Sequence, residues 1–319
     1  MSLMRKIIKN RIGRIVVAGL AFTIGVLVVL SSVQGCGKAG SENDKLMVAS
    51  DIVPLADFCR VIGGDRVEVV TIVPPGATPH TYELTSGQMR FLTEADVMVT
   101  NGLGLTPWAE DVFAKVENPG LVEVVAGEAV PQTELIAAVE SEDGERGVYD
   151  PHTWLDPNLA IYIVEAVCDG FKKADPDNAR YYSDSAEAYI EELKELDSEI
   201  GGITAAFSDR KFVSFHSSWT YFARRYGLEQ VGVIEELPGK EPSVGEIADL
   251  VELIEAQGVK VVFVEPQFNP RAAEAIAEES GGGVTVVTLD PLGDPEDPDK
   301  NTYVKMIKGN VEAMGEVLR

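Results

Sequence analysis

Residues 177–209 read DNARYYSDSAEAYIEELKELDSEIGGITAAFSD, and this stretch decides the expected architecture. Apolar side chains recur along it at spacings of three and four residues, which is the pattern of one continuous amphipathic helix. The members of this stripe are Tyr182, Ala186, Tyr189, Leu193, Leu196, Ile200, Ile203 and Phe207. About 30 residues at roughly 1.5 Å each give a helix about 45 Å long, which can join two lobes rigidly. The paired glycines Gly201 and Gly202 weaken its last turns and allow a bend there.

Short runs rich in Val and Ile alternate with amphipathic stretches on both sides of this helix. Strands are expected at Leu46–Ser50, Val67–Val73, Asp96–Thr100, Leu121–Val125, Phe212–Phe215, Val231–Ile234, Val259–Val264 and Val284–Leu289. Such alternation indicates β-α units and a mainly parallel sheet. A chain of 319 residues also exceeds the usual size of one hydrophobic core. We therefore predict an α/β fold of two lobes, each with a mainly parallel sheet flanked by helices: an N-terminal lobe (46–175), a linking helix (176–208) and a C-terminal lobe (209–319).

The first residues have the features of an export signal. A basic head, residues 5–14, precedes the uncharged apolar run 15–30, which is shorter than the roughly 20 residues that span a membrane. A small residue precedes position 36, and together these features predict a signal peptide over 1–35. Cys36 resembles the lipidated cysteine of bacterial lipoproteins, although an uncleaved signal anchor is the alternative. Residues 36–45 are small and polar and are expected to form a tether.

The composition narrows the class of protein. With 45% hydrophobic and 25% charged residues, the chain is typical of a globular protein rather than a disordered or polytopic membrane protein. Without residues 1–35, it keeps 22 Lys and Arg against 52 Asp and Glu, a net charge of −30. A surface this acidic repels nucleic acid, so we expect no nucleic-acid partner. Cys59 and Cys168 could pair in an oxidising compartment or remain buried free thiols, and the sequence leaves both possibilities open.

The chain has only three histidines, and each is predicted to lie in a loop at the rim of a sheet. His80 and His216 follow expected strands, and His152 lies between two Asp-Pro steps in YDPHTWLDP. Ligand-binding residues of parallel α/β sheets gather beyond the carboxyl ends of the strands. A single loop histidine is usually solvated, but three at such positions indicate a shared ligand. Pro151 and Pro157 restrict the backbone around His152 and thereby orient its side chain.

Two carboxylates also follow expected strands. Asp290 lies in VTVVTLDPLGD, where an Asp-Pro step is also a common way to open a turn. Three neutral imidazoles and one carboxylate form a ligand set that zinc accepts at about 2.0–2.2 Å. We therefore predict a metal site of His80, His152, His216 and Asp290. Glu265, in VFVEPQF, also ends an expected strand and could compete with Asp290 for ligation, but we expect it to support a ligand or to serve as a buried polar anchor.

Five blocks of this chain, in order, resemble the zinc- and manganese-binding solute-binding lipoproteins of ABC importers, the cluster A-I family. They are PPGATPHTYE, DPHTWLDP, FVSFHSSWTYFARRYGL, EPSVGEIADLVELIEAQGVKVVFVEPQFNP and VTLDPLG, and the match runs from about residue 46 to the C-terminus. The resemblance implies that the metal is held between the lobes and that the linking helix limits their motion to a small tilt. It also implies delivery of the metal to a permease that a separate ATPase drives.

The chain departs from the family pattern in two places. Zinc-specific relatives often carry a histidine-rich loop before the second histidine, whereas residues 133–150 are acidic and contain none. After His80 the family usually continues with Pro and Asp, whereas residues 83–88 read ELTSGQ. The first departure removes one argument for zinc.

Three nitrogen ligands and one carboxylate favour Zn²⁺ over Mn²⁺, which prefers more oxygen ligands. Manganese importers similar to this chain tend to have a carboxylate in place of His216. A manganese-specific binding protein or adhesin remains the alternative, and so does a secreted zinc hydrolase, because three histidines with an open position can activate water. Ligation by Asp290 would close that position, and neither HExxH nor GxSxG occurs. We therefore predict a monomeric binding protein and no enzyme, anchored outside the cell membrane or periplasmic.

Overall fold

The computed structural model describes residues 45–138, 149–235, 239–240 and 242–319. The predicted signal peptide, Cys36 and the tether up to Asp44 lie outside the described residues, as does most of the acidic stretch before His152. Among the helices of the described part, none is both long and apolar enough to cross a membrane.

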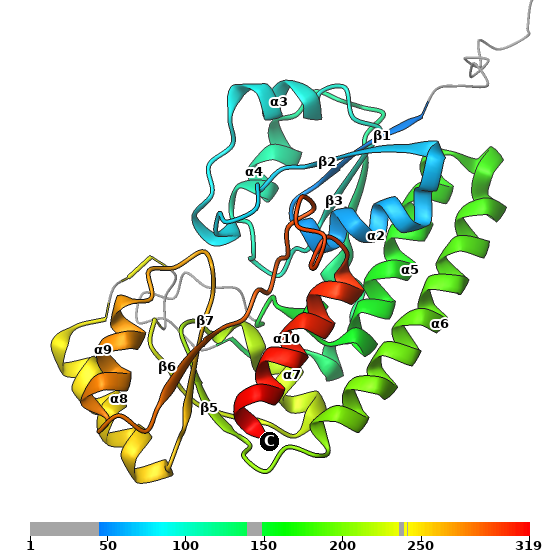
Figure 1. Cartoon of the computed structure of the whole chain (residues 1–319). Helices are drawn as coiled ribbons and strands as arrows, with labels where there is room; N and C mark the ends of the chain where they lie inside the picture. Colours follow the sequence, from blue (N-terminus) through cyan, green and yellow to red (C-terminus); the bar gives the residue numbers. More distant parts are fainter. Residues whose placement is uncertain (1–44, 139–148, 236–238, 241) are drawn as a thin grey trace, which may run out of the picture. The chain divides into compact units, whose positions relative to one another are not determined.

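The first half of the chain forms a four-stranded parallel sheet with the strand order β2-β1-β3-β4 (Figure 1). Its strands are β1 (Leu46–Ser50), β2 (Val67–Thr71), β3 (Val97–Thr100) and β4 (Val122–Val125). Its helices are α2 (Val53–Gly63), α3 (Ser86–Leu92), α4 (Trp108–Lys115) and α5 (Pro157–Ala174). Side chains alternate across the sheet, as they must in a strand. Val97 and Val99 pack in the core that α2 and α5 share, whereas Met98 packs with residues of α3 and α4.

The second half repeats this arrangement with the strand order β6-β5-β7-β8, again parallel throughout. Its strands are β5 (Lys211–Ser214), β6 (Glu229–Val233), β7 (Val261–Val264) and β8 (Thr285–Thr288). Its helices are α7 (Thr220–Tyr226), α8 (Val244–Gln257), α9 (Arg271–Glu279) and α10 (Tyr303–Leu318). Val213 and Val262 pack with α8 and α9 on one face of the sheet. Phe212 and Phe263 point to the other face, into the larger core that includes α10.

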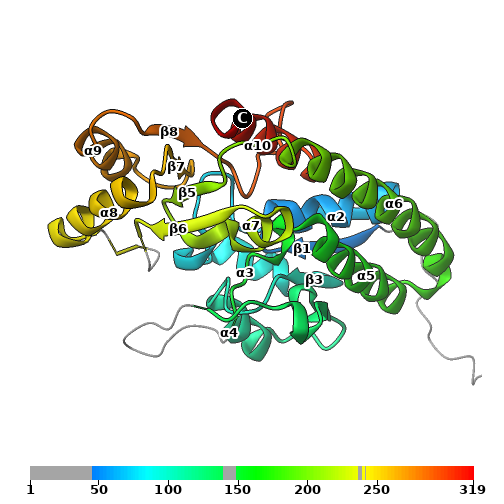
Figure 2. The same cartoon turned by 90° about the horizontal axis from the view of Figure 1, so that it is seen from below.

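The helix α6 (Ala179–Thr204) lies between the two halves of the chain and packs against α5, α2 and α10. Figures 1 and 2 show α5 and α6 side by side. The predicted stripe is its buried face, since Tyr182, Leu193 and Ile200 are each at most 1% exposed. Its 26 residues correspond to about 39 Å. The helix ends at Thr204, whereas the sequence predicted an end near residue 208, and Gly201 and Gly202 are still helical.

The predicted fold class is confirmed: two lobes, each with a parallel sheet flanked by helices, are joined by a long helix. All eight predicted strands are present, with boundaries that differ by at most two residues. Cys59 and Cys168, whose pairing the sequence left open, are both free thiols, and both are buried. The C-terminal helix α10 belongs to the second half of the chain but packs against α6 and against α2 of the first half, so it contributes to the contact between the two halves.

We expect Leu193→Ala to lower the free energy of unfolding by about 2–5 kcal/mol, because it removes a fully buried side chain between α6 and its neighbours. Glu195→Ala, at an exposed position on the same helix, is the matched control and should change it by less than about 0.5 kcal/mol. Urea unfolding measures both. Equal effects of the two substitutions would contradict a structural role of the buried stripe.

Candidate metal centre

Each of the three histidines lies at a single turn of 3₁₀ helix. His80 is inside the turn Pro79–Thr81, His152 directly precedes the turn Thr153–Leu155, and His216 directly precedes the turn Ser217–Trp219. Pro79 begins the first turn, and Pro151 precedes His152, so the backbone is restricted on the approach to both residues. The turns therefore hold the three side chains on short, well-defined pieces of backbone.

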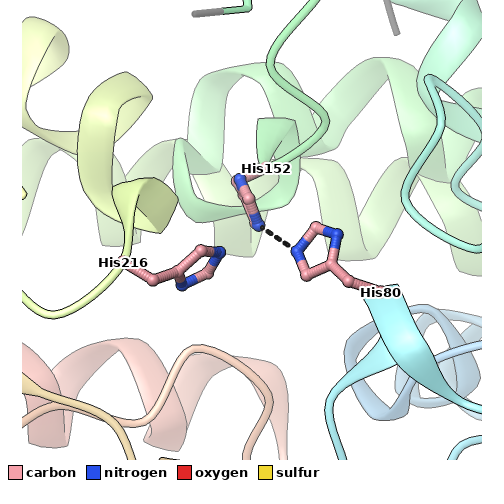
Figure 3. Close-up of side chains that lie close together, drawn as sticks. All are labelled: His80, His152 and His216. Carbon is pink, nitrogen blue, oxygen red and sulfur yellow. Dashed lines mark hydrogen bonds between the residues drawn. The ribbon is translucent and has the colours of Figure 1, made fainter. Parts of the chain in front are cut away.

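The structure brings the three histidines together from positions far apart in the sequence. Figure 3 shows their rings converging, and one ligand nitrogen from each lies within 4.8 Å of the others. The Nε2 atoms of His80 and His152 are 3.2 Å apart. The ring centroids of His152 and His216 are 4.8 Å apart. Since His80 follows β2 and His216 follows β5, the group joins the two lobes.

The three rings border a small cavity of about 20 Å³. Its walls also include Trp154, Glu265, Phe268, Pro291 and Leu292. A volume of this size holds about one water-sized occupant. A larger groove of about 320 Å³ lies between β6 and α8, but no histidine lines it. The converging donors, rather than cavity size, therefore identify the candidate site.

Two of the imidazoles are backed by buried carboxylates. His152 Nδ1 is 2.8 Å from Asp150 Oδ1, which also accepts a hydrogen bond from the backbone N–H of His152. His216 Nδ1 is 2.8 Å from Glu265 Oε2, and the other Glu265 oxygen accepts a hydrogen bond from the Ser218 hydroxyl. A carboxylate at Nδ1 fixes the proton there and leaves Nε2 as the electron-pair donor.

The remaining nitrogens are suited to a cation. His216 Nε2 is buried and has no hydrogen-bond partner among the described residues. His152 Nε2 can only accept a hydrogen bond once its Nδ1 carries the proton, so His80 Nε2 is the donor across their 3.2 Å contact. A metal ion at this point would accept electron pairs from all three nitrogens, provided that His80 carries its proton at Nδ1 instead of Nε2.

The two carboxylate-backed histidines have opposite pKa shifts. Burial lowers the pKa of His152, and the charge and hydrogen bond of Asp150 offset this only in part. Burial acts in the same direction on His216, but the charge and hydrogen bond of Glu265 outweigh it and raise the pKa of His216. His152 therefore stays neutral more readily, and His216 takes up a proton more readily.

The structure places the two predicted carboxylates differently. Glu265 lies behind His216, which agrees with a supporting role. Asp290 lies just after β8, but it is absent from the group of converging ligand atoms found among the described residues. One of its oxygens accepts hydrogen bonds from the backbone N–H groups of Leu292 and Gly293, and the other is 2.8 Å from Lys300 Nζ.

Sequence analysis missed Asp150 as a partner of His152. The signal was present in the DPH step, because an aspartate two residues before another residue commonly accepts that residue's backbone N–H. It also missed how the backbone of this loop is held. The Asn101 side chain donates to the carbonyl of Pro151 at 2.8 Å, and the Tyr221 hydroxyl donates to the carbonyl of Asp150 at 2.8 Å.

A buried carboxylate supports Asn101 in turn. Asp51 follows β1, is fully buried and accepts a hydrogen bond from the backbone N–H of Asn101 at 2.8 Å. Burial raises the pKa of Asp51 to about 7. Asn101 follows β3, so the pair lies beyond the carboxyl ends of the two strands at which the strand order reverses. This pair therefore connects the first sheet to the His152 loop.

The chain is similar to known proteins over most of its length. Residues 48–317 match the sequence model of the family described as zinc-uptake complex component A, periplasmic. The chain is 31% identical to the manganese-binding lipoprotein MntA of Halalkalibacterium halodurans, over 92% of this chain and 96% of that protein. It is 29% identical to the high-affinity zinc uptake system protein ZnuA of Bacillus subtilis, over 88% of this chain and 90% of that protein. A crystal structure of ZnuA is similar with a TM-score of 0.75 and 32% identity, covering 86% of this chain and 100% of that one.

The carboxylate contacts predict the tautomers of two imidazoles in the protein without added metal. At pH 8 we expect His152 and His216 to be protonated at Nδ1 and His80 at Nε2, because only this assignment satisfies the three contacts. Long-range ¹H–¹⁵N correlation spectra of protein labelled at histidine measure this. Glu265→Gln should shift the His216 signals and leave those of His80 nearly unchanged. Protonation of both His152 and His216 at Nε2 would disprove the assignment.

Proposed function

The chain belongs to the zinc-uptake complex component A family, and from this we propose that it is the extracytoplasmic metal-binding component of an ABC importer. The observation that carries the proposal is the convergence of the ring nitrogens of His80, His152 and His216 on one small cavity. In this role the protein captures a divalent transition metal between its lobes and delivers it to a permease that a separate ATPase drives. The named relatives are binding and uptake proteins, and the chain is not an enzyme.

Zinc is the metal that the donor set favours. Three imidazole nitrogens suit a borderline-soft ion, and affinity for such a site rises from Mn²⁺ toward the later first-row metals. The relatives include proteins named for manganese and for zinc, so the preference rests on the donors of this chain. Asp290 is the carboxylate we propose as fourth ligand, which requires it to leave Lys300. Cys36 is the proposed site of lipid attachment, and the lipid would hold the protein at the outer face of the cell membrane.

The buried carboxylates act on the metal through the histidines. Each accepts the Nδ1 proton, orients the ring and raises the electron density on Nε2. Their effect is indirect, so their loss should weaken binding without removing a ligand. Loss of a histidine removes a ligand and should cost more.

The decisive experiment is competition of the purified protein with a chromogenic chelator for zinc and for manganese. We expect one metal per chain and tighter binding of zinc. His152→Ala should weaken zinc binding by on the order of 100-fold or more, since loss of a supporting carboxylate alone costs about 10–100-fold. Glu195→Ala, exposed on α6, is the control and should leave affinity unchanged. Folded wild-type protein that binds neither metal would refute the proposal.

The affinity for zinc should fall as pH is lowered from 8 to 5, because protons compete with the metal for Nε2. The reference pKa of histidine is about 6.5. Glu265 raises the pKa of His216, so the decline should begin above pH 6.5, while the lowered pKa of His152 delays its protonation. Glu265→Gln should move the onset of the decline to lower pH. Calorimetric titrations across this range test the prediction, and a constant affinity would contradict it.

A further inference from the structure

Building on the proposed function, we propose that Lys300 is an internal cation that competes with the bound metal for the Asp290 carboxylate. The ammonium group of Lys300 binds an oxygen of this carboxylate and thereby disfavours metals that depend on a carboxylate ligand. Lys300 so contributes to selectivity for zinc over manganese. The inference concerns a residue outside the histidine cluster, on the segment between β8 and α10.

The Asp290 carboxylate is fully engaged. Lys300 Nζ lies 2.8 Å from Asp290 Oδ2, and the lysine and aspartate side chains are 32% and 13% exposed. Asp290 Oδ1 accepts the two backbone N–H groups that follow it, at 3.1 and 2.9 Å. Asn310 holds the backbone of Asp290 through two further hydrogen bonds of 2.7 Å each. Of these partners, only the lysine side chain can be exchanged without unfolding the turn.

Asp290 directly precedes two residues that line the cavity. The next two residues, Pro291 and Leu292, line the same cavity as the histidines. The Trp154 indole N–H donates to the carbonyl of Pro291 at 2.8 Å and thereby ties this segment to the His152 loop. The Asp290 carboxylate therefore belongs to a segment that borders the cavity and is tied to the His152 loop.

A displaced Lys300 has another acidic partner at hand. Asp297 Oδ2 is 4.0 Å from Lys300 Nζ in the present arrangement. The loop that carries both is held by its own turns, since the backbone N–H of Lys300 donates to the Asp297 carbonyl and that of Asp297 donates to the Asp294 carbonyl. The ammonium can thus move from Asp290 toward Asp297 while the backbone stays in place.

The exchange affects metals unequally. Zinc is held well by three imidazole nitrogens and gains less from a fourth, oxygen ligand. Manganese binds nitrogen ligands more weakly and depends more on carboxylate oxygen. A lysine that competes for the carboxylate therefore weakens manganese binding more than zinc binding.

The test is Lys300→Met, which removes the ammonium and keeps an unbranched apolar stem, with Lys300→Gln as a second variant. Lys305→Met is the matched control, because Lys305 lies close in sequence but contacts the Pro298 carbonyl and Asn301. We expect manganese affinity to rise about threefold to tenfold in both Lys300 variants, zinc affinity to rise less, and the control to match wild type. The absorption spectrum of the Co²⁺-loaded protein should change in the Lys300 variants, because without the competing lysine Asp290 coordinates the ion in a larger share of the molecules.

Repeating the measurements in an Asp290→Asn background completes the test. There, the Lys300 substitution should no longer change affinity or the Co²⁺ spectrum. Unchanged or lower manganese affinity in the Lys300 variants, an equal gain for both metals, or a gain that persists without Asp290 would overturn the inference. If one of these results is found but the wild type still binds zinc through His152, only the role of Lys300 is refuted and the proposed function stands. Failure of the folded wild type to bind any metal refutes the proposed function instead.

Discussion

The whole arrangement depends on bringing three imidazoles together, two of them buried, so that their donor nitrogens meet at one point. A buried polar group without a partner costs about 1–3 kcal/mol, so the fold must supply either hydrogen bonds or a ligand. Asp150 and Glu265 supply the hydrogen bonds at Nδ1. Nothing among the described residues supplies a hydrogen bond to His216 Nε2. The carboxylates thus satisfy the outer nitrogens of His152 and His216, and the buried Nε2 of His216 is suited to a cation.

Such convergence requires that the two lobes keep a fixed relation. The largest hydrophobic core runs through α2, α5, α6 and α10 and reaches side chains of both sheets. Polar contacts add to it, because Arg225 of α7 pairs with Asp197 of α6 through two hydrogen bonds. The Tyr303 hydroxyl donates to the carbonyl of Trp154, which lies beside the site. Rigidity here is a requirement of the chemistry, since displacement of one lobe by a few ångströms separates His216 from the other two ligands.

The sequence predicted the elements well because local patterns determine them. Val- and Ile-rich runs, the three- and four-residue spacing of the helix and the positions of the three histidines all require only nearby residues. The end of α6 was less predictable. Ile203 and Phe207 continue the apolar pattern, but the helix ends at Thr204, and Phe207 is buried although it lies after the helix. The partners of Asp290 could not be predicted, since Lys300 reaches it only through the fold of the intervening loop. Patterns identify residue types for a site, whereas tertiary contacts decide which of them are available.

The formal charges near the site give a reason for the ion pair between Asp290 and Lys300. Asp150 and Glu265 place two carboxylates behind two of the imidazoles, and a third, Glu235, is also buried and acts electrostatically on His216. Asp290 would add a further negative charge to the site, and an unbalanced buried charge is costly. Lys300 neutralises it at 2.8 Å, so Asp290 adds no net charge to the site until a metal draws it away from the lysine. A metal that binds Asp290 must therefore gain enough free energy from the oxygen ligand to offset the loss of this ion pair. Zinc binds the imidazole nitrogens more strongly than manganese does, so it depends less on that gain.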